Sequence, residues 1–185
     1  MPLTKIKEEV YLRDYKKTGY YKESLKLVYK IFSNEEKDKK IEGYVFPVNG
    51  MGLWDAIYGY LAIETDADTV IGISWYDQKE TPGLGANISE PEWQSQFPNK
   101  KIFQESANGT TDFQTAPLGI IVVKGKVNEV IGNSPKALSA VDGMAGATLT
   151  GNGVQNAYRD VLAAYRPFLL LLHEKNGNTQ TKEAK

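Results

Sequence analysis

The chain has 185 residues, of which 41% are hydrophobic and 24% charged, and its 22 Lys+Arg and 23 Asp+Glu leave a formal net charge of -1. These ordinary values fit one globular domain and exclude a disordered chain or a collagen. The charge balance lacks the basic surplus of a duplex-binding protein, so we expect no nucleic-acid partner. The absence of cysteine excludes thiolate catalysis and iron–sulfur clusters.

The N-terminal part is basic and contains no long apolar segment. Lys and Arg outnumber Asp and Glu over residues 1–40, and no signal peptide is visible. The longest apolar run, Phe168–Leu172, is much shorter than the about 20 residues that a membrane-spanning helix needs. We expect a basic segment at 1–24, one domain at 25–173 and a disordered polar tail at 174–185.

Two antiparallel hairpins are predicted in the first half of the chain. Residues 25–32 alternate in character and are followed by a charged turn and by residues 41–48, which predicts the first hairpin. Residues 56–64 and 69–76 are rich in Ile, Val, Tyr and Trp and flank a short polar turn, which predicts the second. The run Pro47–Gly52 is expected to break the strand that precedes it.

A short helix, a buried strand and a C-terminal helix are predicted in the second half of the chain. Pro91 favours a short helix through Phe97, and the fully apolar, β-branched run 118–123 is typical of a buried strand. From Thr150 onwards, apolar residues recur at spacings of three and four, which predicts an amphipathic helix that Pro167 should kink or end. The fold class is therefore α+β, with antiparallel hairpins packed against helices.

The most informative segment is the Gly- and Ala-rich run from Asp142 to Gly153. It precedes the predicted helix, whose N-cap is expected to be Thr150. Small side chains let a ligand approach the backbone closely, and the free N–H groups at a helix start favour a phosphate. On the residues alone, both a plain turn with a helix cap and an anion site fit this segment.

At these residues the chain resembles the FMN-binding domain found in the C subunit of the sodium-translocating NADH:quinone reductase and in the G subunit of the related Rnf electron-transport complex. The motif of that family is an Asp, a Gly and then Ser/Thr-Gly-Ala-Thr, and its last Thr carries FMN through a phosphoester bond. The resemblance assigns this role to Thr148. The sequence departs from the motif at Ala145, where the family usually has Ser or Thr.

Further segments carry the same resemblance in the same order. Val45–Trp54 and Glu80–Gly85 look like two signature segments of the reductase's C subunit, and 91–97 and 153–156 extend the match. Together they span most of the chain. Because the first of these segments resembles the reductase most, we favour its C subunit over the G subunit of the Rnf complex.

The resemblance and the residue types together give a candidate flavin site. Trp54 can offer a flat apolar face to the isoalloxazine ring, although it can also be core filler. The Thr81 hydroxyl and the space beside Gly85 can serve the flavin, or this segment can be a plain surface loop. Lys124 can place a positive charge near the reduced flavin, or it can be a solvated lysine. The candidate cofactor-binding residues are Trp54, Glu80, Thr81, Leu84, Gly85, Lys124, Gly146, Ala147, Thr148, Leu149, Thr150 and Asn152.

We expect neither a metal site nor a catalytic side chain. His173 is the only histidine, and it is interpreted as a partly exposed residue near a helix end. The chemistry is therefore assigned to the cofactor. A non-redox binding module of the same fold, which uses the Gly-rich cleft for another ligand, is the alternative.

The resemblance implies one electron-relay subunit of a membrane complex that moves electrons from NADH to quinone and pumps sodium. Its cofactor is covalent FMN, its partners are the other subunits, and a flavin transferase that uses FAD attaches the FMN. We expect the isolated domain to be monomeric, without turnover with NADH. Members of the family carry an N-terminal anchor in the inner membrane and face the periplasm, so we expect residues 1–24 to adjoin an anchor that this sequence lacks.

Overall fold

The computed structural model describes residues 8–16, 19–22, 24–34 and 40–183. Most of the charged turn expected in the first hairpin lies outside the described residues, as does the start of the basic segment. The helices and strands, with η for a 3-10 helix, are α1 (Glu8–Tyr15), η1 (Tyr20–Lys22), β1 (Tyr29–Phe32), β2 (Ile41–Met51), β3 (Ala56–Glu64), β4 (Val70–Asp77), η2 (Gly85–Ser89), α2 (Pro91–Gln94), β5 (Ile121–Val122), α3 (Val127–Val130), η3 (Pro135–Ser139), β6 (Ala140–Val141) and α4 (Thr148–Glu183).

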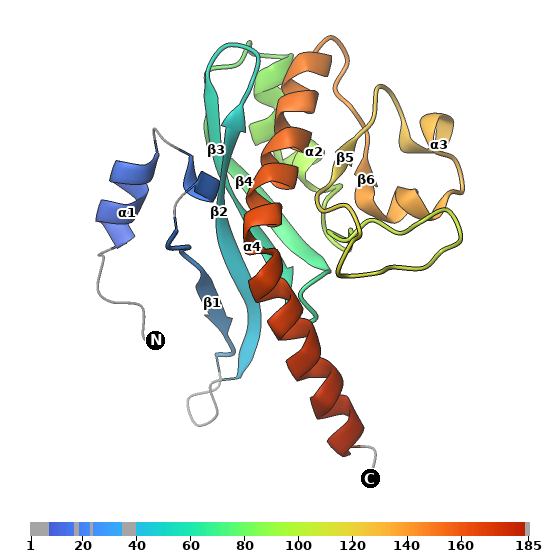
Figure 1. Ribbon diagram of the computed structural model, residues 1–185. Helices are drawn as coiled ribbons and strands as arrows, with labels where there is room; N and C mark the ends of the chain where they lie inside the picture. Colours follow the sequence, from blue (N-terminus) through green and yellow to red (C-terminus); the bar gives the residue numbers. More distant parts are fainter. Residues whose placement is uncertain (1–7, 17–18, 23, 35–39, 184–185) are drawn as a thin grey trace.

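A four-stranded antiparallel sheet in the order β1-β2-β3-β4 forms the centre of the fold (Figure 1). Both predicted hairpins are present, and β2 also pairs with β3 along most of its length. On β3, the fully buried Ile57, Leu61 and Ile63 alternate with half-buried residues. This period of two follows from the pleat of a strand with one face toward the core. The predicted α+β fold is confirmed.

The strand β2 is longer than predicted, and the expectation that Pro47–Gly52 breaks it was wrong. It continues through Pro47 to Met51. β1 is shorter than predicted and pairs only as far as Val45, so no other described strand pairs with that side of β2 beyond this point. A proline, which has no N–H to donate, is tolerated at such an edge. Pairing with β3 on the other side holds this end of β2 extended.

The long helix α4 packs across the sheet and contacts mainly β2 (Figure 1). The residues predicted to share one helical face are all buried in the core, which confirms the periodicity; they are Val154, Tyr158, Val161, Leu162 and Tyr165. The ring centroids of Phe46 on β2 and Tyr165 on α4 lie 4.8 Å apart, in the edge-on arrangement that aromatic pairs prefer. The position of α4 is therefore fixed by a continuous apolar interface.

The helix α4 does not end at Pro167, which lies inside it. A proline removes one main-chain hydrogen bond and disfavours a helix interior. Leu169 and Leu172, which follow the proline, are buried in the same core as the residues before it. Packing of these side chains offsets the lost hydrogen bond and lets the helix continue.

Three further expectations differ from the structure. The tail that we expected to be disordered from Glu174 is helical as far as Glu183. His173 therefore lies within α4 rather than near a helix end. The short helix predicted from Pro91 to Phe97 ends at Gln94. The sequence thus located both helices correctly but misplaced their C-terminal ends.

A second, two-stranded sheet lies beside the start of α4. Its strands β5 and β6 are parallel, and β5 is shorter than the strand predicted at 118–123. Leu118 makes only an isolated bridge, and Gly119 has a φ of 114°, which interrupts an extended strand. The N–H of Val122 donates to Oε1 of Gln155 on α4 at 3.0 Å. This bond ties the small sheet to the first turns of the helix.

Candidate functional site

Three of the segments that carry the resemblance, Val45–Trp54, Glu80–Gly85 and Asp142–Gly153, meet at Glu80, which is only 5% exposed. Its carboxylate accepts hydrogen bonds from the backbone N–H groups of Leu53 and Trp54, each at 3.0 Å. It also accepts one from the hydroxyl of Thr150. A single carboxylate therefore connects the loop after β2, the loop after β4 and the first turn of α4.

Thr148 is exposed and is the first residue of α4, directly after the Gly- and Ala-rich loop. The first backbone bond of the helix runs from the N–H of Gly151 to the carbonyl of Ala147, at 3.0 Å. In the part of the chain that the structure describes, the N–H groups of Thr148, Leu149 and Thr150 have no hydrogen-bond acceptor. Such groups, at the positive end of the helix dipole, favour an anion.

A cavity of about 420 Å³ lies at this helix start. Its walls include Lys124, Lys126, Thr148 and Asn152, together with small residues of the Gly- and Ala-rich loop. Nζ of Lys126 lies 3.0 Å from a carboxylate oxygen of Asp142. The cavity thus combines an exposed hydroxyl, free N–H groups, the Lys124 side chain and the ion pair of Lys126 with Asp142.

The structure separates the residues predicted for the site into three groups. Those that line the cavity are Lys124, Gly146, Ala147, Thr148 and Asn152. Those exposed at the surface outside its lining are Trp54, Thr81, Leu84 and Leu149. Those buried are Glu80, Gly85 and Thr150.

Trp54 is not core filler, since it is 67% exposed. Its indole N–H donates to the Thr81 hydroxyl at 3.1 Å, and its backbone N–H donates to Glu80. These two bonds hold an exposed aromatic ring in place. Cδ2 of Leu84 lies 2.9 Å from the point that a β-carbon on Gly146 would occupy, so the apolar surface reaches the Gly- and Ala-rich loop. An ordered aromatic and apolar surface of this kind suits a planar ligand.

Thr150 and Gly85 have roles other than those expected. Thr150 does not cap the helix, because α4 begins two residues earlier and the buried Thr150 hydroxyl donates to Glu80. A β-carbon on Gly85 would lie 2.5 Å from Oγ1 of Thr150 and 2.8 Å from Oε2 of Glu80. The space beside Gly85 is therefore filled by these side chains and is not open to a flavin ring.

Lys126 is a cavity residue that sequence reasoning missed. The signal that could have found it was its position two residues after Lys124 in a short lysine-glycine-lysine run. Its partner Asp142 also accepts the N–H of Val127, at 2.8 Å, and the Asp142 carbonyl accepts the indole N–H of Trp93 at 2.9 Å. Burial raises the pKa of Asp142, but the bonds from Val127 and Lys126 lower it more, so the pKa lies below its ordinary value.

Replacement of Asp142 tests the acid stability of this site. A carboxyl whose pKa is lowered by folding stabilises the fold above its unfolded pKa, about 4, and loses that contribution as the pH falls through the folded pKa. Asp142→Asn should therefore lower the free energy of unfolding by about 1–2 kcal/mol at pH 7 and by less at pH 3. The exposed Glu129→Gln should change little at either pH. Urea unfolding measures both, and equal losses for Asp142→Asn at the two pH values would contradict an ionic role.

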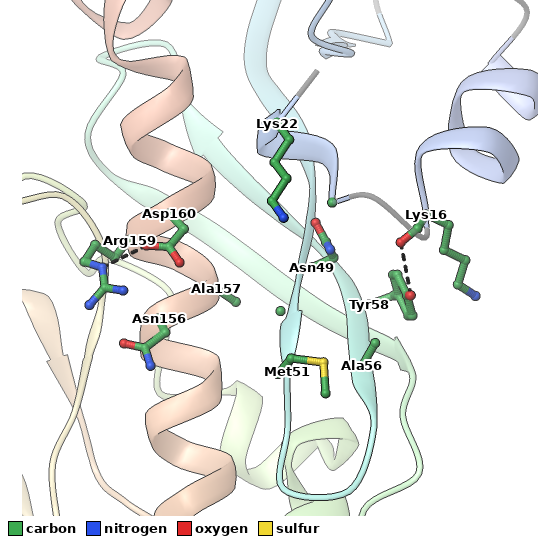
Figure 2. Close-up of a pocket in the computed structure, with 12 residues that line it drawn as sticks. Lys16, Lys22, Asn49, Met51, Ala56, Tyr58, Asn156, Ala157, Arg159 and Asp160 are labelled. Atoms are coloured by element: carbon green, nitrogen blue, oxygen red, sulfur yellow. Dashed lines mark hydrogen bonds and ion pairs between the residues drawn. The ribbon is translucent and has the colours of Figure 1, made fainter. Parts of the chain in front are cut away.

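A further cavity, of about 380 Å³, lies between α4 and the end of β2 (Figure 2). Much of its charge is already neutralised: Lys16 pairs with Asp77, and Arg159 pairs with Asp160 at 2.9 Å. It contains neither the helix start nor the Gly- and Ala-rich loop. The cavity at Thr148 is therefore the better candidate site.

In the described ranges, no group of three or more His, Asp or Glu side chains is arranged to hold a metal ion. None of the helices described there combines the length and the apolar character that crossing a bilayer requires.

Comparison with known proteins gives a family and close relatives. Residues 52–163 match the model of the FMN-binding domain. The C subunit of the Na(+)-translocating NADH-quinone reductase of Chlamydia caviae is 48% identical over 169 residues, which cover 85% of this chain and 53% of that protein. The corresponding protein of Chlamydia pneumoniae is 56% identical over 139 residues, which cover 73% of this chain and 43% of that protein. The chain thus spans about half the length of these relatives.

A solved structure supports the same relationship. The crystal structure of Shewanella oneidensis NqrC aligns with a TM-score of 0.60 and 32% sequence identity, over 78% of this chain and 60% of that chain. The range matched by the family model includes Trp54, the Glu80–Gly85 loop and Thr148. These findings confirm the resemblance: the chain belongs to the FMN-binding domain family, and its relatives include the C subunits of Na(+)-translocating NADH-quinone reductases.

Proposed function

We propose that this chain carries one FMN, attached through a phosphoester bond to the hydroxyl of Thr148. The observation that carries the proposal is the position of Thr148, exposed at the first residue of α4 and in the wall of the cavity. Thr150 is a poor alternative acceptor, because its hydroxyl is buried and already bonded to Glu80.

The residues of the site fit the cofactor. The phosphate would be held by the free N–H groups at the start of α4 and by the positive charge of Lys124. Small side chains on the loop before Thr148 leave its backbone accessible. Trp54 and Leu84 provide exposed apolar surface for the ring system.

The chain itself contributes attachment and position. When bound, FMN supplies reversible one- and two-electron transfer. The bond to Thr148 keeps the cofactor from dissociating, and Glu80 fixes the segments around it. No side chain of the site is required to transfer a proton or to act as a nucleophile toward a substrate. The arrangement therefore suits an electron-carrying domain rather than an independent enzyme.

We further propose that the chain serves as an electron relay in a membrane reductase that passes electrons from NADH to quinone and transports sodium. Identities of 48% and 56% to proteins named as the C subunit of such a reductase support this role over that of the G subunit of an Rnf complex. The partners would be the other subunits and a flavin transferase that installs the FMN. The domain would face the periplasm beside the inner membrane and would be monomeric in isolation.

The response to reductants distinguishes a relay from an enzyme. The sequence has no G-x-G-x-x-G fingerprint after a strand, so we expect no nicotinamide site. After coexpression with a flavin transferase, dithionite should bleach the FMN-loaded domain readily, whereas NADH alone should reduce it slowly or not at all. Stopped-flow absorbance measures both rates. Rapid bleaching by NADH would instead indicate an oxidoreductase, and a domain that stays colourless would favour a non-redox binding module.

A further inference from the structure

The carboxylate of Glu80 is buried, and the described part of the chain offers it no cationic partner. None of the ion pairs found among the described residues involves it. A buried charge is costly unless hydrogen bonds replace the water that it has lost. The donors around Glu80 therefore have to supply all of its compensation.

All the neighbours bonded to this carboxylate are donors. Oε1 accepts the N–H of Trp54, and Oε2 accepts both the N–H of Leu53 and the hydroxyl of Thr150. An amide or a protonated acid at this position would turn a hydrogen toward a donor, so an ionised carboxylate is the group that satisfies them. Burial raises the pKa of Glu80, but the bonds from Thr150, Trp54 and Leu53 lower it more, to below its ordinary value.

Two glycines confine the carboxylate. A β-carbon on Gly52 would lie 2.5 Å from Oε1 of Glu80, and one on Gly85 would lie 2.8 Å from Oε2. Both distances are far below a normal contact, so any larger residue would displace the acid. The absence of these side chains lets both loops pack directly on the carboxylate, which leaves it little room to move.

The same bonds couple the exposed tryptophan to the helix start. One carboxylate oxygen holds Trp54, and the other holds Thr150, two residues after Thr148. We propose that Glu80 is a positioning residue that keeps the Trp54 ring and the Thr148 end of α4 in one fixed arrangement, and thereby gives the bound flavin a single orientation. This inference rests on the proposed attachment of FMN at Thr148.

The neighbouring charges leave this role to Glu80 itself. Asp55 and Lys79 lie on the two loops joined by Glu80, and they pair with each other at 2.6 Å. On α4, the group bonded to Glu80 is the uncharged Thr150. Replacing the acid with its amide therefore leaves no cation without a partner, and the effect reports on the hydrogen-bond donors.

Hydrogen exchange of the FMN-free protein tests the arrangement without the cofactor. In the wild type, the amides of Leu53 and Trp54 should be protected by Glu80. Glu80→Gln should speed their exchange by about tenfold, because each loses a hydrogen bond to a charged group. Glu90→Gln, at an exposed residue of a neighbouring segment, is the matched control and should leave both amides protected.

The FMN-loaded protein tests the consequence for the flavin. In Glu80→Gln, the visible circular dichroism of the flavin should fall by about twofold, since a loosely held site allows several ring orientations. Thr150→Val keeps the carboxylate, so it should leave the Leu53 and Trp54 amides protected while it weakens the same flavin signal. The wild-type signal should fall reversibly in acid, below the ordinary range of a glutamate, and the signal of Glu80→Gln should not follow that titration.

The outcomes separate this inference from the proposed function. If Glu80→Gln leaves either the amide exchange or the flavin signal unchanged, the positioning role is overturned. If Glu80→Gln does not fold, as judged by far-ultraviolet circular dichroism, two other measurements decide: the visible circular dichroism of the flavin in Thr150→Val, and that of the wild type in acid. If the flavin signal is unchanged in either of them, the positioning role of Glu80 is overturned. If the wild-type protein accepts no FMN in the presence of a flavin transferase, the proposed function fails instead, and intact mass shows this before any variant is made.

Discussion

Replacing Thr148 with alanine is expected to abolish covalent attachment of FMN completely. The phosphoester needs a side-chain hydroxyl at the start of α4, and Thr148 is the exposed residue there that has one. Thr150 is unsuited to take over, because the residue is only 1% exposed and its hydroxyl donates to Glu80. Intact mass spectrometry of protein coexpressed with a flavin transferase measures the result directly.

Two variants serve as controls for this experiment. Thr148→Ser keeps the hydroxyl and should retain attachment. Thr110→Ala removes a hydroxyl from a distant exposed loop and should be modified like the wild type. A Thr148→Ala protein that still gains the mass of FMN would place the attachment at another residue, which peptide mapping would then identify.

Of the substitutions proposed, Gly153→Ala is expected to destabilise the fold most, lowering the free energy of unfolding by about 3 kcal/mol. A β-carbon at this position would lie 2.0 Å from the carbonyl oxygen of Met51, where α4 crosses the end of β2. Met51 cannot retreat easily, since it pairs with Ala56 in the sheet. The clash should outweigh the gain of about 1 kcal/mol that alanine normally brings to a helix interior.

The matched control for this variant is Gly72→Ala on β4. No heavy atom lies within 4 Å of the β-carbon that it would add. Gly72→Ala should change the free energy of unfolding by no more than about 0.5 kcal/mol. Urea unfolding of the two variants compares a glycine required by close packing with one that is not. A Gly153→Ala protein as stable as the wild type would mean that α4 and β2 do not approach so closely.

The sequence alone predicted those features that depend on neighbouring residues. The two hairpins follow from short runs of strand-forming residues separated by polar turns, and both are present. The buried face of α4 follows from spacings of three and four residues, as Val154 and Tyr158 illustrate. The Gly- and Ala-rich run placed the start of α4 to within two residues, because small residues before a helix cap are a local signal, whereas the role of Thr148 came from the family resemblance and stays a prediction.

Only the tertiary structure decided the features that depend on distant residues. β2 continues past Pro47 because β3 pairs with it as far as Met51. On the other side of β2, β1 has already ended, so the missing N–H of the proline costs no strand pairing there. The roles of Thr150 and Gly85 follow from Glu80, which is 70 residues from Thr150 in the chain. No local pattern could predict these contacts, since a hydroxyl can cap a helix or bond to a buried acid, and a glycine can leave space for a ligand or a side chain. Which of these occurs depends on the segment that packing brings beside the residue.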